Sequence, residues 1–311
     1  MTWARTLSPG KRATIKYLHE VKPIWNLMIP FFVILWASAA ALQLAAPVWP
    51  VRILTYVVIG ICIHGLANLM HEGIHGNLFR NQRLDRWVGF ALGAPALFSV
   101  SAYRTNHLLH HRYTRRAEDP DELTNLISDR RVLSAVFYLL LLVGMVIYIA
   151  HVPINALRRG KPHERRAVLT EYALLAIVYS GVVWLAVRSH AGVLLVNCWL
   201  VPMTVAAAFG NLRSLAEHAM TEKGDPLTET RTVTSNRIVS FLNCNLNYHL
   251  EHHLFPAVPW YNLPKVHALL RDDYRKIGAF VYRSYARFLW DAIRAGVHGQ
   301  APEPSVRFRK A

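Results

Sequence analysis

The sequence predicts an all-α protein with about four transmembrane helices and a cytoplasmic helical cap, and three observations lead to that prediction. The 311 residues are 53% hydrophobic and only 17% charged, which is more apolar than a typical soluble domain. Several apolar blocks reach the roughly 20 residues that a helix needs to cross a bilayer. Basic residues, which give a formal net charge of +16, flank these blocks. We therefore expect one membrane-embedded domain over residues 1–311.

The first two apolar blocks, residues 27–46 and 53–70, predict a membrane hairpin closed by the turn PVWPVR. Basic residues precede the first block, and positive charge favours the cytoplasmic side, so the N-terminus is predicted to be cytoplasmic. No small-residue cleavage site follows this basic segment, and we expect it to be retained. The second span then returns the chain to the cytoplasmic side at HEGIH, residues 71–75.

The distribution of charge separates spanning from non-spanning blocks in the rest of the chain. Residues 168–187 and 191–212 are joined by a short connection and predict a second hairpin. Residues 132–150 have basic residues on both sides, so we expect this block to enter the interface without crossing. Residues 88–103 form a short block interrupted by Pro95, which also predicts no crossing. All histidine-rich segments then lie on one side of the membrane.

Three clusters place histidines at helical spacing. HEGIH has histidines at i and i+4, while HLLHH and HLEHH each have them at i, i+3 and i+4. These positions share one face of a helix, so each cluster directs its imidazoles to one point. The members are His71, His75, His107, His110, His111, His249, His252 and His253. Eight imidazoles exceed the three protein ligands of a catalytic zinc ion, which indicates two metal ions.

Ligand type alone does not choose the metal, since imidazole binds zinc, copper, iron and nickel. Cys62, Cys198 and Cys244 are far apart in the sequence and form no pair typical of a disulfide framework or a cysteine zinc site. An all-histidine pair of sites beside apolar spans favours iron and the activation of oxygen on a lipid substrate. HEGIH also matches the HExxH motif of zinc proteases, with Glu72 as general base, but a protease leaves the other two clusters unexplained.

The order of the clusters resembles the three histidine boxes of the membrane fatty acid desaturase and hydroxylase superfamily. The flanks YRTNHLLHHRYTRRAEDPDE and NLNYHLEHHLFPAVPWYNLPKVH are similar to those of bacterial acyl-lipid or fatty acyl desaturases, and the resemblance covers residues 50–270. It implies that the boxes hold two iron ions, as Fe2+ or Fe3+, with dioxygen as co-substrate. It also implies one more histidine ligand before the third box, which RSLAEH supplies as His218. The family pattern departs at Ser214, where one relative has an asparagine.

The resemblance implies oxygen-dependent desaturation of a fatty acyl chain, either lipid-linked or carrier-linked, at a diiron centre. Hydroxylation or ketolation of a carotenoid, an alkane or another lipid is the alternative within the superfamily. Outside it, the alternatives are a membrane zinc metalloprotease and a non-catalytic protein that binds metal or senses lipid. Histidines outside the clusters are expected to be structural, apart from His64, which lies seven residues before His71 in an apolar span and could support the site.

Electrons are expected from a separate carrier, because the sequence contains no haem-binding or iron–sulfur motif. A ferredoxin, rubredoxin or cytochrome b5 with its reductase would fit, and a basic cytoplasmic surface would attract such acidic carriers. No nucleic-acid recognition motif accompanies the basic residues, so nucleic acid is not expected. The expected location is the cytoplasmic membrane of a bacterium, with both termini and the active site in the cytoplasm.

Three carboxylates beside the histidines, Glu72, Glu217 and Glu251, are predicted to orient the ligands. A carboxylate that accepts a hydrogen bond from the ring nitrogen facing away from the metal fixes the tautomer and the ring orientation. Asp119 and Asp121, in the turn-like EDPDE, could have the same role or lie in a solvated loop.

Overall fold

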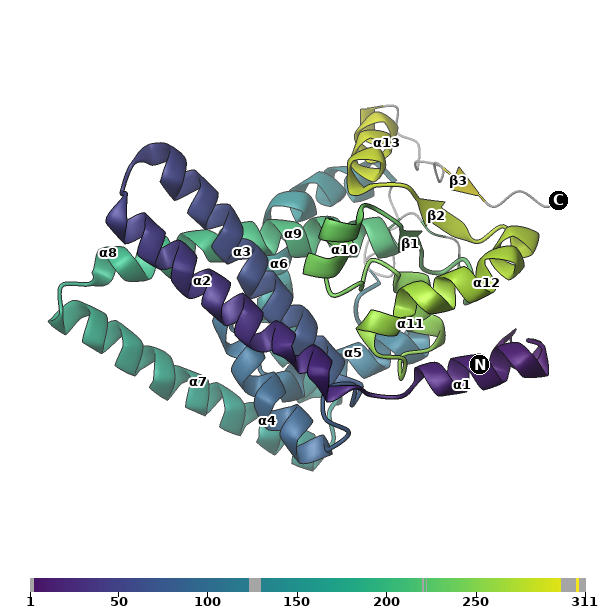
Figure 1. Cartoon of the computed structure of the whole chain (residues 1–311), viewed down its shortest axis with the longest axis horizontal. Coiled ribbons are helices and arrows are strands. Elements are labelled where there is room, and N and C mark those ends of the chain that lie inside the picture. Colours follow the sequence, from purple (N-terminus) through teal and green to yellow (C-terminus); the bar gives the residue numbers. More distant parts are fainter. Residues whose placement is uncertain (1–2, 123–129, 220, 222, 298–305, 308–311) are drawn as a thin grey trace. The chain divides into compact units, whose positions relative to one another are not determined.

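The computed structural model describes residues 3–122, 130–219, 221, 223–297 and 306–307. Helices make up most of these residues (Figure 1), which confirms the all-α prediction. The chain divides into two compact units. Unit 1 comprises residues 1–22, 109–142 and 211–311, and unit 2 comprises residues 23–108 and 143–210. The expectation of a single domain stays a prediction.

Within the described residues, four helices are long and apolar enough to cross a membrane. They are Pro23–Ala45, Trp49–Ile74, Pro162–Arg188 and Gly192–His218. Each contains one of the predicted spans or overlaps most of it, so the expectation of about four transmembrane helices is confirmed. The side of the membrane that each end faces stays a prediction.

Helices α2 (Met28–Ala45) and α3 (Trp49–Ile74) form the first hairpin and lie side by side in unit 2 (Figure 1). Pro50 lies in the first turn of α3, where the backbone N–H groups have no partner within the helix. The helix can therefore begin directly after the short turn without losing a hydrogen bond. At Gly65 of α3, a Cβ atom would lie only 2.3 Å from the ring of Phe32 on α2, so glycine is required for this close packing. Helix α3 continues to Ile74, which places HEGIH at its C-terminal end.

The second hairpin consists of α7 (Pro162–Arg188) and a longer helix formed by α8 (Gly192–Leu195), the π-helical segment η5 (Val196–Leu200) and α9 (Val201–His218). Pro202 explains the π-helical segment. Because it has no N–H, the carbonyl of Cys198 loses its usual helical donor. The indole nitrogen of Trp36 donates to this carbonyl at 2.9 Å and thereby connects α2 to η5.

The block at residues 88–103 does not form one helix. Helix α4 (Gln82–Gly93) ends in the 3-10 turn η3 (Ala94–Ala96), and α5 (Val100–Tyr113) begins after it. Leu97, with a positive φ of 64°, completes the break. Pro95 therefore interrupts the block as predicted.

The block at residues 132–150 lies in α6 (Arg130–Arg159). Several side chains in the first half of this helix are outside the described residues. Its failure to cross the membrane therefore stays a prediction.

Unit 1 contains a small sheet in addition to helices. Strand β2 (Phe280–Tyr282) pairs in parallel with β1 (Thr232–Val233) and antiparallel with β3 (Val306–Arg307). The sequence did not lead us to expect this sheet. Helix α12 (Leu263–Ile277) ends at Gly278, whose φ of 71° turns the chain into β2.

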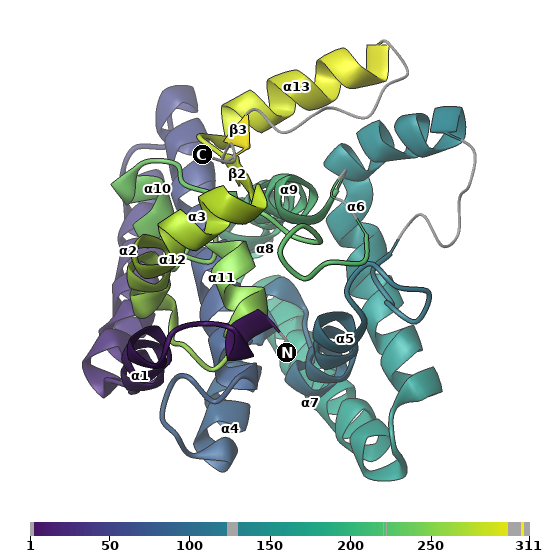
Figure 2. The same cartoon turned by 90° about the vertical axis from the view of Figure 1, so that its right-hand side faces the viewer.

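Helix α11 (His249–Leu254), which carries the third histidine cluster, contacts α12 (Figure 2) and β1 (Figure 1) in unit 1. Its Leu250 belongs to a buried apolar cluster with residues of α12 and of α1 (Pro9–Leu18). The other described elements of unit 1 are η1 (Trp3–Arg5), α10 (Arg237–Leu242), η6 (Trp260–Asn262) and α13 (Tyr285–Val297). Helix α11 has only six residues, and a helix this short depends on its packing against α12 and α1 for stability.

Candidate metal centre

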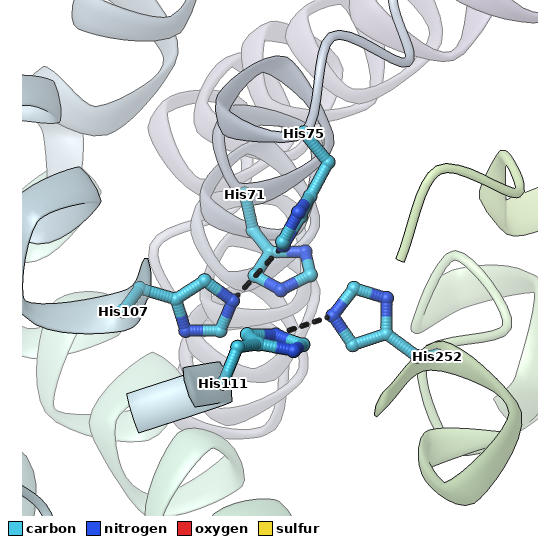
Figure 3. Close-up of side chains that lie close together, drawn as sticks. All are labelled: His71, His75, His107, His111 and His252. Carbon is cyan, nitrogen blue, oxygen red and sulfur yellow. Dashed lines mark hydrogen bonds between the residues drawn. The ribbon is translucent and has the colours of Figure 1, made fainter. Parts of the chain in front are cut away.

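In unit 2, three histidines come together from the ends of two helices. Figure 3 shows His71 of α3, His75 directly after α3, and His107 of α5 turned toward one another. One ring nitrogen from each lies within 4.8 Å of the others. The closest approach joins Nε2 of His75 to Nε2 of His107 at 3.1 Å. The one-turn spacing of HEGIH therefore places two imidazoles on the same face, as predicted.

Packing and burial fix these three imidazoles. The ring of Tyr103, one turn before His107 on α5, stacks on the His107 ring with centroids 5.3 Å apart. Tyr103 also contacts the His71 ring edge-on at 6.5 Å. Burial, with a smaller contribution from the positive charge of Arg104, lowers the pKa of His75. This side chain is therefore neutral, the form that binds metals.

In unit 1, the remaining six histidines come from three segments that are far apart in the sequence. His110 and His111 lie in the last turn of α5, His218 ends α9, and α11 supplies the rest. Nitrogen atoms of His110, His218 and His253 lie within 4.8 Å of one another. Nε2 of His249 is 2.7 Å from Nε2 of His218. Nε2 of His252 is 3.1 Å from Nε2 of His111 (Figure 3).

Three of these imidazoles share one orientation. Nδ1 of His110 is 2.9 Å from a carboxylate oxygen of Asp119, and Nδ1 of His249 is 3.2 Å from one of Glu217. Nδ1 of His253 is 3.3 Å from the hydroxyl oxygen of Thr114. The contacts of His110 and His253 are hydrogen bonds, whereas Glu217 approaches Nδ1 of His249 without forming one. An oxygen beside Nδ1 leaves Nε2 to face a metal ion. This is the arrangement by which carboxylates orient metal-binding histidines.

The protonation of these residues follows from the same contacts. Burial by itself would lower the pKa of His110, but its hydrogen bond to Asp119 and the charges of Asp119, Asp121 and Glu122 outweigh burial and raise the pKa. For His249 and His253, burial and the neighbouring imidazoles hold the pKa well below its usual range. Both are therefore neutral, which leaves a ring nitrogen able to bind a metal ion.

The donor set fits a transition metal. Nε2 of His253 is buried and has no hydrogen-bond partner among the described residues. A buried polar atom of this kind calls for an explanation such as an ion. Imidazoles are ligands for iron, copper, nickel and zinc.

Comparison with known proteins identifies the family. Residues 47–285 match the family described as fatty acid desaturase. The chain belongs to the fatty acid desaturase family. The matched segment includes every histidine of both units described above, and it agrees with the resemblance expected over residues 50–270.

Individual relatives have low sequence identity to this chain, but their similarity extends over two thirds of it or more. The chain is 28% identical to a dihydrorhizobitoxine desaturase of Bradyrhizobium elkanii, over 85% of this chain and 81% of that protein. It is 24% identical to an sn-1 oleoyl-lipid 12-desaturase of Arthrospira platensis, over 81% of this chain and 76% of that protein. It is 27% identical to a zeaxanthin 4-ketolase of Chlamydomonas reinhardtii, over 67% of this chain and 42% of that protein. The chain is thus a membrane protein and a desaturase-type oxidoreductase.

The structure places the three predicted carboxylates of this desaturase-family chain in different surroundings. Glu217 contacts His249, and its other oxygen accepts a hydrogen bond from the Tyr285 hydroxyl at 3.2 Å. Glu72 lies 3.5 Å from Nδ1 of His71 and accepts a hydrogen bond from Asn77. Of the two aspartates, Asp119 is buried beside His110, so the solvated-loop alternative does not apply to it.

Glu251 contacts a histidine that the sequence did not single out. Its two oxygens accept hydrogen bonds from Nδ1 of His267, at 2.7 Å, and from the Thr232 hydroxyl. These contacts tie α11 to α12 and to β1. Glu251 therefore supports the helix that carries three clustered histidines, rather than one imidazole.

Sequence reasoning missed His267, Thr114 and Tyr285. Thr114 lies four residues after His110, so helical spacing could have suggested it. His267 lies in the PKVH segment after the third cluster, but a single histidine on an amphipathic helix gives no signal for a carboxylate partner. Tyr285 is 68 residues after Glu217, and no sequence pattern connects them.

Proposed function

We propose that this family member catalyses the oxygen-dependent desaturation of a fatty acyl chain at two iron ions bound by histidines. The proposed ligands are His71, His75, His107, His110, His111, His218, His249, His252 and His253. The observation that carries this proposal is the orientation of His110, His249 and His253, each of which has a carboxylate or hydroxyl oxygen within 3.3 Å of Nδ1. The facing Nε2 atoms of His218 and His249 agree with it. Family membership supports the reaction type.

The chain's own residues orient the imidazoles and keep them neutral. Iron bound by these imidazoles would supply the activation of dioxygen that removal of hydrogen from an unactivated methylene requires. Hydrogen bonds with Asp119 and Thr114 orient His110 and His253 at Nδ1 before any metal arrives. Glu217 lies beside Nδ1 of His249 at 3.2 Å. Burial keeps His249 and His253 neutral, as the pKa shifts indicate. No proton donor among the side chains is needed for substrate binding, because an acyl chain is apolar.

We further propose that a separate electron carrier and its reductase supply the electrons, and that a ferredoxin, rubredoxin or cytochrome b5 fills this role. The basic character of the chain supports the docking of an acidic carrier. The proposed location is the cytoplasmic membrane of a bacterium, with both termini in the cytoplasm. Fusing each terminus to a reporter active only in the cytoplasm tests this topology, and a silent C-terminal fusion beside an active N-terminal one would contradict it.

The decisive experiment compares fatty acid methyl esters from host cells that express the wild type, His252→Ala or His163→Ala. His163 is an exposed histidine in the first turn of α7, outside the clusters, and serves as a matched control. The wild type and His163→Ala are expected to give a new unsaturated acyl chain, and His252→Ala is not. Identical profiles from the wild type and His252→Ala would remove the main support for the proposal.

Ketolation is the second candidate, because one relative over 67% of this chain is a zeaxanthin 4-ketolase. Expression in a carotenoid-producing host separates the two reactions. Oxygenated carotenoids without a new unsaturated fatty acid would favour the ketolase. Metal analysis of the purified protein separates both from the zinc protease suggested by HEGIH, since a single zinc ion and no iron would contradict an iron oxidoreductase.

A further inference from the structure

Helix α7 carries a buried carboxylate inside a candidate membrane span. Glu171 lies within Pro162–Arg188, and its side chain is 2% exposed. An ionisable group in a membrane segment is costly to bury unless it is paired and hydrogen-bonded, and such groups usually have a function. Glu171 belongs to none of the histidine clusters and to none of the carboxylates that contact them.

Its two oxygens accept hydrogen bonds from residues of two other segments of unit 2. One oxygen accepts from Nε and Nη2 of Arg86 on α4, at 3.2 and 3.1 Å, and from the Ser101 hydroxyl at 2.6 Å. The other accepts from the Ser99 hydroxyl at 2.7 Å and from the backbone N–H of Ser101 at 2.8 Å. The contacts with Ser99 and Ser101 concentrate at one place, the start of α5.

These contacts form a helix cap that uses a side chain from another helix. The first N–H groups of an α-helix have no partner within the helix, and a side-chain oxygen usually supplies one. Ser99 precedes α5, and its hydroxyl oxygen accepts from the N–H of Ala102 at 3.0 Å. Glu171 accepts from the neighbouring N–H of Ser101. Its negative charge also lies at the positive end of the α5 dipole.

The capped helix carries a clustered histidine less than two turns further on. His107 is six residues after Ser101, which is about 9 Å along a helix. Its Nε2 atom is 3.1 Å from that of His75. A shift or rotation of the first turn of α5 would therefore change the distance between these two imidazoles.

We propose that Glu171 is a positioning residue, which caps α5 from α7 and thereby fixes the placement of His107 for metal binding. The cap stands on the contacts alone, while its consequence for metal binding rests on the proposed function. Apolar packing between the same helices accompanies the cap, because Val168 of α7 and Ala102 of α5 belong to one buried cluster. Val168 lies three residues before Glu171 and is fully buried, so it provides a matched control on the same helix.

The test uses the full-length protein in detergent and two measurements. Amide hydrogen exchange of the metal-free protein reports the cap at residues 100–103, and metal analysis reports the iron and zinc bound per chain. For Glu171→Ala, loss of the cap should speed exchange in the first turn of α5 by about tenfold, and bound metal should fall. Ser99→Asp added to Glu171→Ala supplies a carboxylate at the start of α5 itself, next to Arg86. It should return both measurements toward the wild type. Val168→Ala loses packing but keeps the cap and should show neither local change.

Two results would overturn the proposal. One is amide exchange in the first turn of α5 that does not distinguish the variants as expected. It could be as slow in Glu171→Ala as in the wild type, or as fast in Val168→Ala as in Glu171→Ala. The other is faster exchange in Glu171→Ala with unchanged bound metal. If Glu171→Ala does not fold, Glu171→Gln replaces it, since it keeps the shape and loses the charge, and a smaller change in the same direction is expected. Zinc in place of iron in the wild type would contradict the proposed function and still test Glu171, whereas a wild type without either metal would overturn both.

Discussion

The two units hold their clustered histidines by different means. In unit 2, His71, His75 and His107 stand at the ends of two helices, and the ring of Tyr103 packs against them. In unit 1, the histidines come from three separate segments, and an oxygen lies beside Nδ1 of three of the six: His110, His249 and His253. Helix placement sets the first group, whereas contacts at Nδ1 help to orient these three members of the second.

This difference teaches where each group should be sensitive to substitution. A helix-borne imidazole moves when its helix moves, so distant residues such as Glu171 matter for unit 2. An imidazole held by a carboxylate rotates when that carboxylate changes, so neighbouring residues such as Asp119 matter for unit 1. Substitutions can separate the two cases by their effects on metal affinity and on amide hydrogen exchange in the helices.

The largest expected effect is the loss of a ligand from either unit. His107→Ala in unit 2 and His253→Ala in unit 1 should each reduce the new unsaturated fatty acid to the level of the empty host, because each removes a proposed iron ligand. Fatty acid profiles and iron content of the purified variants measure this. Full activity in one of the two variants would show that the histidines of that unit do not serve the reaction.

The next effect concerns the carboxylate that holds His110. Asp119→Asn keeps the shape and removes the negative charge, so iron affinity should fall by about 10- to 100-fold, as is usual for residues that orient a ligand. Competition with a chelator measures it. Asp121→Asn is the control, because this carboxylate is 3.9 Å from Nδ1 of His110, beyond hydrogen-bond distance. Equal losses in both variants would point to general electrostatics instead of orientation.

A smaller effect is expected for the aromatic ring in unit 2. Tyr103→Leu removes the ring that stacks on His107, and such aromatic contacts contribute about 1 kcal/mol. Iron affinity should therefore fall by roughly fivefold, with faster hydrogen exchange near His107. If chelator competition instead shows a loss as large as that of Asp119→Asn, the contrast between the units does not hold.

The smallest effect on iron affinity is expected at Tyr285, which contacts Glu217 and not an imidazole of unit 1. Tyr285→Phe removes the hydroxyl that donates to Glu217, while Glu217 keeps its contact with His249. A hydrogen bond to a charged group contributes about 1.5 to 3 kcal/mol, but only a small part of this reaches His249 through Glu217, so iron affinity should fall by less than about fivefold. Glu217→Gln should cost more, because it changes the group that touches the imidazole. A larger loss for Tyr285→Phe would mean that Tyr285 acts on the site by another route.

Much of the fold could be predicted, because local properties determine it. The four spans follow from apolar length, and Pro95 breaks the block at residues 88–103 because proline lacks an N–H. The boundaries were less accurate: α3 runs past residue 70 to Ile74, since HEGI continues the helix without a breaking residue. The small sheet of unit 1 was not predicted, because each strand is only two or three residues long and carries no periodic pattern.

The sequence by itself determined that His71 and His75 share a helix face, because a spacing of four residues acts within one helix. The expectation that every cluster directs its imidazoles to one point was wrong for HLLHH and HLEHH: His110 and His253 meet His218, while His111 meets His252. It also predicted the family, through histidine clusters whose order and flanks resemble those of fatty acid desaturases, and the family match confirms this. Only the tertiary structure decided the partners: Asp119 for His110, His267 for Glu251, and the start of α5 for Glu171. These pairs depend on how separate segments pack within a unit, and hydrogen bonds form only where packing brings donor and acceptor within about 3 Å.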